Sequence, residues 1–259
     1  MRALFGWLML ALSGSVSAEG VPFYAQISVS LDSTATRPLA SVIEADVIVS
    51  DAGKAAGYLT AWPDIVARVT DKQTLHVTLP ERAAYAGEAT PAYLRSSFVV
   101  DTDEPATRAF TDGFPAAADT PPTPDALMAY VDSYIDNPSY IHGFNIASVI
   151  ATQRSGDCTE YAVLTSALAR ALGLPARVIL GTVIIDSGDG VLAFGHAWSE
   201  VQFDGQWHIT DSALYRSTGT RHFYLPSGAL DNEGPGFGMS LMTLNMLLPA
   251  RLDGVKSAP

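Results

Sequence analysis

The sequence has 259 residues, of which 48% are hydrophobic, and a formal net charge of −12. A chain of this length forms one large domain or two smaller ones. Its acidic balance, which no basic cluster offsets, argues against a partner made of nucleic acid or anionic lipid. A single cysteine excludes an internal disulfide, so we expect this thiol to be functional.

Residues 1–18 have the pattern of a secretory signal peptide. Arg2 precedes an apolar run at 3–12, and Val16-Ser17-Ala18 supplies a cleavage site made of small residues. The run is too short for a membrane anchor, which needs roughly 20 apolar residues, and no cysteine near the cleavage site could carry a lipid. We therefore expect a periplasmic or secreted protein that is not inserted in the membrane after signal cleavage.

Residues 19–110 are predicted to form a small all-β, sandwich-like domain. Segments rich in β-branched and aromatic residues alternate with turns rich in Pro, Gly and Asp. The predicted strands cover 23–31, 42–49, 75–79 and 97–100. Pro-rich and Asp-rich segments then connect this domain to a second one, which we place at 111–259.

The second domain is predicted to begin with helices. Thr123 as N-cap and Pro124 at the first helical position start one helix, and a shorter helix follows from Asn145. The strongest helix prediction covers 157–172, where Asp157 and Glu160 have the spacing of a capping box. This helix carries almost no charge after its first turn, so we expect it to be buried on most sides.

Cys158 stands at the start of this helix, where the helix dipole favours a thiolate. The strands that follow are predicted at 177–185, 192–203 and 206–211, and Asp204-Gly205 is typical of a two-residue hairpin turn. If Phe203 pairs with Gln206, then His196 is the diagonal neighbour of Asp211 on the same face, within side-chain reach. The same register pairs His208 with Val201 on the opposite face.

Cys158, His196 and Asp211 can therefore form a nucleophilic triad. In such a triad the cysteine attacks a carbonyl carbon, the histidine moves the proton and the aspartate orients the histidine. The backbone N–H of Cys158 is the first candidate donor to the oxyanion, and Gln153, five residues upstream, is a candidate for the second. Each residue alone also fits a structural role, as an inert buried thiol, a packed histidine and a turn aspartate.

The segments after Asp211 carry less information. We predict a strand edge at 221–224, a turn at 232–238 and an apolar segment at 239–248 that packs on the core, with its methionines as filler. The alternative is that 221–224 and 232–238 border the cleft and shape specificity. No motif for a metal or cofactor is visible, so none is expected.

Three blocks of the sequence resemble the transglutaminase-like superfamily: Gly156-Asp157-Cys158-Thr159-Glu160-Tyr161-Ala162, the segment 168–178, and Gly195-His196-Ala197-Trp198-Ser199-Glu200-Val201 followed by Gly205-Gln206-Trp207 and Asp211. The resemblance covers about residues 140–215. It implies an α+β, papain-like core in which a central helix packs on an antiparallel sheet. It also implies that Cys158 is the nucleophile, His196 the general base and acid, and Asp211 the orienting residue.

The resemblance and the predicted triad leave three functions open. The first is an exported cysteine enzyme that hydrolyses peptide or side-chain amide bonds of a protein or peptide substrate through a thioester. The second is transfer of the same acyl group to an amine. The animal cross-linking enzymes of the superfamily follow their cysteine with a tryptophan and use calcium, and Thr159 departs from that pattern. The third is a binding or assembly module without catalysis. The oligomeric state is left open.

Overall fold

The computed structural model describes residues 25–115, 121–139, 144–217 and 221–259. The predicted signal peptide lies outside the described residues. The helices are α1 (Ala52–Leu59), η2 (Pro91–Leu94), α2 (Pro105–Asp112), α3 (Pro124–Tyr134), α4 (Ala147–Gln153), α5 (Cys158–Ala171) and α6 (Phe237–Asn245). Within these ranges no helix has the length and apolar character that a membrane span requires.

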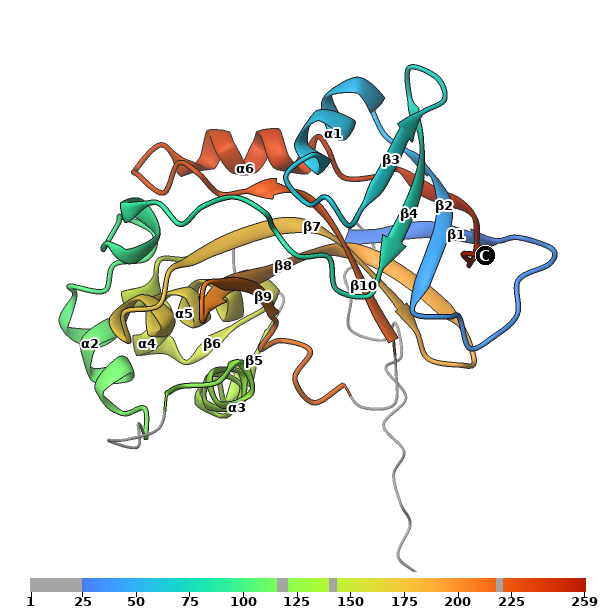
Figure 1. Cartoon of the computed structure of the whole chain (residues 1–259). Helices are drawn as coiled ribbons and strands as arrows, with labels where there is room; N and C mark the ends of the chain where they lie inside the picture. The colour runs from blue at the N-terminus through green and yellow to red at the C-terminus, as the bar shows by residue number, and fades with distance from the viewer. Residues whose placement is uncertain (1–24, 116–120, 140–143, 218–220) are drawn as a thin grey trace, which may run out of the picture.

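Most strands join one large sheet, ordered β10-β7-β8-β1-β11-β2-β4-β3, with β9 paired to β8. The strands are β1 (Gln26–Leu31), β2 (Val42–Ile48), β3 (Val66–Val69), β4 (Thr74–Pro80), β7 (Ala176–Asp186), β8 (Val191–Phe203), β9 (Gln206–Thr210), β10 (Arg221–Ala229) and β11 (Arg251–Ser257). A second, two-stranded sheet pairs β5 (Asn137–Pro138) with β6 (Ser155–Gly156). In Figure 1 the helices α2 to α5 lie below β7 and β8, whereas α1 and α6 lie above them.

The central helix α5 begins and ends where the sequence predicts. Asp157 is its N-cap, and the capping box with Glu160 is formed in both directions. Every residue from Glu160 to Arg170 is buried, because the helix packs against the antiparallel strands β7 and β8 on one side and against α3 and α4 on the other. The predicted fold class, a central helix on an antiparallel sheet, is confirmed.

The N-terminal region is mainly β, but it differs from the prediction: strand β3 and helix α1 were not predicted, and one predicted strand is absent. Helix α1 follows β2 and starts at the N-cap Asp51, whose side chain accepts from the Lys54 N–H. Residues 97–100 are not a strand, so that prediction is wrong. The Ser97 side chain accepts from the Val100 N–H at 2.9 Å, and this local bond holds a turn instead.

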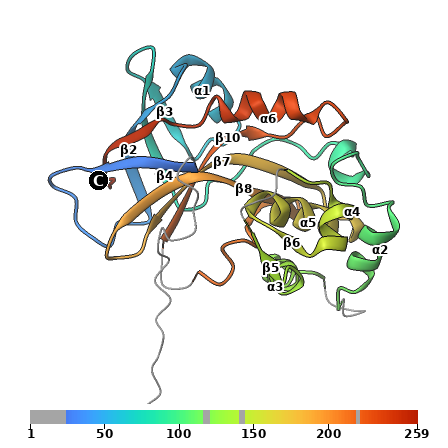
Figure 2. The same cartoon turned by 180° about the vertical axis from the view of Figure 1, so that it is seen from behind.

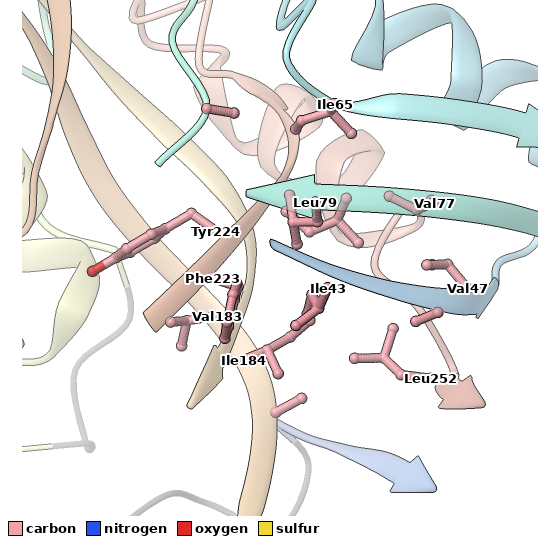
Figure 3. Packing of buried hydrophobic residues seen from close by; sticks show 14 of the residues in the cluster. Ile43, Val47, Ile65, Val77, Leu79, Val183, Ile184, Phe223, Tyr224 and Leu252 are labelled. Carbon is pink, nitrogen blue, oxygen red and sulfur yellow. The ribbon is translucent and has the colours of Figure 1, made fainter. Parts of the chain in front are cut away.

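The N-terminal strands share their sheet and their core with the second half of the chain. The C-terminal strand β11 lies between β1 and β2, parallel to β1 and antiparallel to β2. Figure 2 shows the N-terminal strands next to β7, β8 and β10. In Figure 3, side chains of β2, β4 and β11 pack against side chains of β7 and β10 in one apolar cluster. The division at residue 110 stays a prediction, and the two regions meet through this core.

Helix α6 does not bury its methionines. Met239, Met242 and Met246 are exposed, and only Leu244 of the helix is buried. The interpretation of these methionines as core filler is therefore wrong. The apolar contacts of the helix are made by Phe237, Leu241 and Leu244, which leaves the methionine side turned outward.

A buried ion pair joins the N-terminal region to the core strands. Arg177 of β7 donates to Glu200 Oε2 of β8 through Nε at 2.9 Å and Nη2 at 2.6 Å. Trp62 Nε1 donates to the other carboxylate oxygen at 2.6 Å, and the Tyr85 ring lies 3.2 Å from the guanidinium. Burial raises the pKa of Glu200, and the charge of Arg177 opposes that rise.

Replacing Arg177 with methionine should therefore lower the free energy of unfolding by about 3–5 kcal/mol, because it leaves the Glu200 carboxylate buried without its countercharge. Chemical denaturation at neutral pH measures this loss. The control is Arg251→Met, which removes the exposed pair with Asp253 at 2.7 Å and should cost less than about 1 kcal/mol. Equal losses in both variants would contradict the assignment.

Candidate active site

Cys158 is the first residue of α5, and the capping box determines which backbone donors around it are free. The Asp157 N–H is bound by Glu160 Oε2 at 3.0 Å, and the Thr159 N–H by Asp157 Oδ1 at 3.1 Å. The Tyr161 N–H donates to the Asp157 carbonyl at 3.0 Å. Among the described residues the Cys158 N–H has no partner, so this donor remains free beside the sulfur.

The start of α5 is anchored by the carboxylate of Glu160. This buried side chain also accepts from Thr159 Oγ1 at 2.9 Å and from the Asn145 N–H at 3.1 Å. Burial is the main cause that raises the pKa of Glu160, to about 7. Gly156 allows the contact, because a Cβ there would lie 2.3 Å from the Glu160 side chain.

His196 lies on a part of β8 that has a strand on one side only. β9 pairs with β8 from Ser199 to Phe203, and β1 pairs with it at Ala193 and Phe194. Between these partners, residues 195–198 pair with β7 alone within the described chain. The histidine therefore stands at an opening in the sheet.

The hairpin register that places His196 near Asp211 is confirmed. Phe203 pairs with Gln206, and Asp204 and Gly205 both have positive φ values, 49° and 78°, as a type I′ turn requires. His196 Nε2 lies 2.8 Å from Asp211 Oδ2, and both side chains are buried. The aspartate thus fixes the orientation of the imidazole ring.

Two further bonds hold α5 against the elements that carry the imidazole and the carboxylate. Ser199 Oγ of β8 donates to the Ala162 carbonyl at 2.7 Å, one turn beyond the cysteine. Thr165 Oγ1 lies 2.6 Å from the hydroxyl of Ser212, the residue after Asp211. The helix start, the strand and the segment after β9 are therefore held in a fixed arrangement.

The second ring nitrogen of His196 faces the remaining partner. Nδ1 is buried and makes no hydrogen bond of good geometry to any residue that the structure describes. Burial alone would lower the pKa of His196, but the negative charges of Asp211 and then Cys158 outweigh it and raise the pKa to about 10. Since Nε2 is taken by the aspartate, Nδ1 is the atom that can exchange a proton with the Cys158 sulfur.

The Asp211 carboxylate is bound at both oxygens. Oδ1 accepts from the N–H groups of Ala213 at 3.1 Å and Leu214 at 3.3 Å, and Oδ2 accepts from the Tyr224 hydroxyl at 2.9 Å. Burial would raise the pKa of Asp211, but the charge of His196 and these hydrogen bonds hold it below its usual value. Asp211 is therefore an ionised carboxylate in a buried site.

In the structure His196 interacts with both Asp211 and Cys158, whereas none of the described contacts joins Gln153 to these three residues. Gln153 is the last residue of α4, is exposed, and lines a surface hollow with residues of α2 and α4. Its assignment as an oxyanion donor has no support from these contacts. His208 is exposed and pairs with Val201, as predicted. The residue that the sequence did not point to is Tyr224, which the strand prediction at 221–224 covered without a role.

A metal centre is not among the features of the described residues. In the ranges that the structure covers, no three His, Cys, Asp or Glu side chains gather in an arrangement that could hold an ion.

The family model of the transglutaminase-like superfamily matches residues 108–212 of the chain. This part of the chain is similar to that superfamily, and it makes up less than half of the sequence. The matched segment runs from α2 to the residue after Asp211, so it includes Cys158, His196 and Asp211. Among curated proteins, none matches the sequence.

Solved structures that are similar to the chain include the following two. One is a provisionally named cysteine protease from Cytophaga hutchinsonii, 17% identical with a TM-score of 0.39, covering 71% of this chain and 80% of that chain. The other is the periplasmic domain of TgpA from Pseudomonas aeruginosa bound to ethylmercury, 18% identical with a TM-score of 0.43, covering 74% and 83%. Likeness at this level says nothing of activity.

Proposed function

We propose that this transglutaminase-like protein is an exported cysteine enzyme that hydrolyses peptide or side-chain amide bonds of a protein or peptide substrate. The observation that carries the proposal is the buried contact of 2.8 Å between His196 Nε2 and Asp211 Oδ2, with Nδ1 left toward Cys158. A thiol at a helix start, an imidazole and an orienting carboxylate are the parts that acyl transfer through a thioester requires.

In the first half of the reaction the Cys158 thiolate attacks the amide carbon, and the carbonyl oxygen becomes an oxyanion. The free backbone N–H of Cys158 is placed to donate to that oxygen. When the C–N bond breaks, the leaving amine takes a proton from His196, and the acyl group stays on sulfur as a thioester.

In the second half a water molecule gives a proton to His196 and adds to the thioester carbon. A second oxyanion forms and collapses, the C–S bond breaks, and the products are a carboxylic acid and the cysteine paired again with a protonated imidazole. Asp211 keeps the imidazole in one orientation through both halves. Water is abundant outside the cell, which favours hydrolysis over transfer to an amine.

The choice between water and amine as acceptor can be tested with casein as a glutamine-containing substrate, in water enriched in ¹⁸O and in the presence of a fluorescent primary amine. We expect ¹⁸O in newly formed carboxylates, measured by mass spectrometry, and no ¹⁸O with Cys158→Ala. Covalent incorporation of the amine, absent in the same variant, would identify acyl transfer and overturn the hydrolase proposal.

A non-catalytic binding module is the remaining alternative. It predicts that casein stays unchanged and that Cys158 reacts with iodoacetamide no faster than a cysteine in the unfolded chain. Both results together would remove the enzyme proposal.

A further inference from the structure

Tyr224 shares a carboxylate oxygen with the histidine of the site. Its hydroxyl donates to Asp211 Oδ2 at 2.9 Å, the same atom that lies 2.8 Å from His196 Nε2. Tyr224 is 2% exposed and Asp211 5% exposed. Because water has little access to this oxygen, the tyrosine hydroxyl and the imidazole are its two donors among the described side chains.

The ring of Tyr224 is fixed by the sheet and by an aromatic neighbour. It stands on β10, where Tyr224 pairs with Val183 of β7, and its ring lies edge to face with Trp198 at a centroid distance of 5.2 Å. The Trp198 indole packs directly over Gly181 of β7, where a Cβ would lie 2.8 Å from it. Figure 3 shows the Tyr224 ring at the edge of the apolar cluster, with its hydroxyl pointing out of the cluster.

The two oxygens of Asp211 are held from different directions. The turn after β9 binds Oδ1 through the N–H groups of Ala213 and Leu214, whereas Tyr224 binds Oδ2 from a strand on the far side of β7. The plane of the carboxylate is therefore set without help from His196. It stays set while the imidazole gains and loses its proton.

The tyrosine bond also acts on the charge of Asp211. A hydroxyl that donates to a carboxylate stabilises its negative charge, and Oδ2 then attracts the proton on Nε2 less strongly than it would alone. The burial of the whole group makes this effect larger than it would be in water.

We infer that Tyr224 is a positioning residue of this site: its hydroxyl holds the Asp211 carboxylate in line with His196 and weakens the hold of that carboxylate on the imidazolium. This inference rests on the proposed function. It adds a fourth side chain, from β10, to the three that the superfamily resemblance marks.

Tyr224→Phe keeps the ring and removes only the hydroxyl. We expect turnover to fall about tenfold, as for loss of one buried hydrogen bond to a charged group. We also expect the upper step in the pH dependence of Cys158 alkylation by iodoacetamide, where His196 loses its proton, to move to higher pH. A purely structural role for the hydroxyl would leave this step in place.

The matched control is Tyr134→Phe, whose hydroxyl donates to the Ala151 carbonyl at 2.7 Å between α3 and α4. It removes the same atom from a bond of similar length away from the triad, and it should shift neither turnover nor the pH step. Thermal melts of both variants verify that they are folded.

The outcomes separate this inference from the proposed function. If Cys158 in the wild-type protein reacts no faster than in urea, the activated thiol is absent and both fail. If the wild-type thiol is fast and Tyr224→Phe shows an unmoved or lowered upper step, only the role of Tyr224 is overturned. A raised step with slower turnover supports it.

Discussion

Asp211→Asn is expected to lower turnover by about 10⁴-fold while the protein stays folded, the size of loss known for the aspartate of a Ser-His-Asp triad. Asparagine fills the same volume and can still accept from the turn after β9. Its neutral amide, however, cannot stabilise an imidazolium, and it lets His196 adopt the tautomer that carries the proton on Nδ1, so that the nitrogen toward Cys158 cannot accept one.

The same variant should change the pH dependence of Cys158 alkylation by iodoacetamide, in a direction that follows from the charges around His196. Burial lowers the pKa of His196, while the charges of Asp211 and Cys158 raise it to about 10. Without the aspartate charge, less opposes the effect of burial, so the pKa of His196 should fall and the upper pH step should move to lower pH. Tyr224→Phe is expected to move it up, and the opposite signs distinguish the two roles.

The free energy of unfolding should also depend on pH through the protonation of His196. His196 has a higher pKa in the folded protein than its usual 6.5, so its stabilising contribution is fully present below about pH 6.5 and is lost as pH rises toward 10. The free energy of unfolding of the wild-type protein should therefore fall across this window. The fall should be smaller in Asp211→Asn.

Asp46→Asn is the matched control for the measurements of turnover and of the pH steps. Asp46 Oδ1 lies 2.8 Å from His76 Nδ1 across β2 and β4, the same kind of contact at the same distance, but on the surface. Its removal should leave turnover and the pH steps unchanged. Wild-type turnover in Asp211→Asn would remove Asp211 from the site.

The contact between His196 and Asp211 could be predicted because it is local in sequence. The two residues are 15 apart, and a two-residue turn at Asp204-Gly205 together with the alternation of side chains fixes their relative position. The position of Cys158 is likewise set by local chemistry, since the capping box alone determines where α5 begins. The start of α5 and the contact between His196 and Asp211 thus follow from short-range rules.

Tyr224 could not be predicted in this way. It reaches Asp211 because β10 pairs with β7, and β7 with β8, and no spacing rule in the sequence specifies these pairings in advance. The position of β11 between β1 and β2 is non-local for the same reason. Helix α1 was missed although Asp51 is a good N-cap, because the surrounding strands suggested a uniform β region.

The assignment of Gln153 as an oxyanion donor stays a prediction, and the chain changes direction directly after this residue. Arg154, the residue after α4, has a left-handed conformation with φ 52° and ψ 37°. This residue ends the helix and sends the chain into β6, and the Gln153 side chain is exposed and lines the surface hollow with residues of α2 and α4. Gln153→Ala is a useful surface substitution for that reason.

Cys158→Ala should reduce turnover to background, and Cys158→Ser should do nearly the same. Serine keeps the position and the hydrogen-bonding capacity of the side chain, but an alkoxide is far harder to form than a thiolate beside the same imidazole. The loss in the serine variant would show that the reaction depends on thiolate chemistry and not on an uncharged group at the helix start.

The reactivity of the thiol can be measured without knowing the substrate. A free cysteine, with a pKa of about 8.5, is almost entirely thiol at about pH 6 and reacts slowly with iodoacetamide. A thiolate paired with the His196 imidazolium stays reactive there, and we expect Cys158 to alkylate at least about tenfold faster at about pH 6 than the same residue in the urea-unfolded chain. Intact-protein mass measures this, because the chain has one cysteine. His196→Gln should abolish this faster alkylation, and Gln153→Ala should keep it. Faster alkylation that survives in His196→Gln would mean that the helix start alone, without the imidazole, activates Cys158.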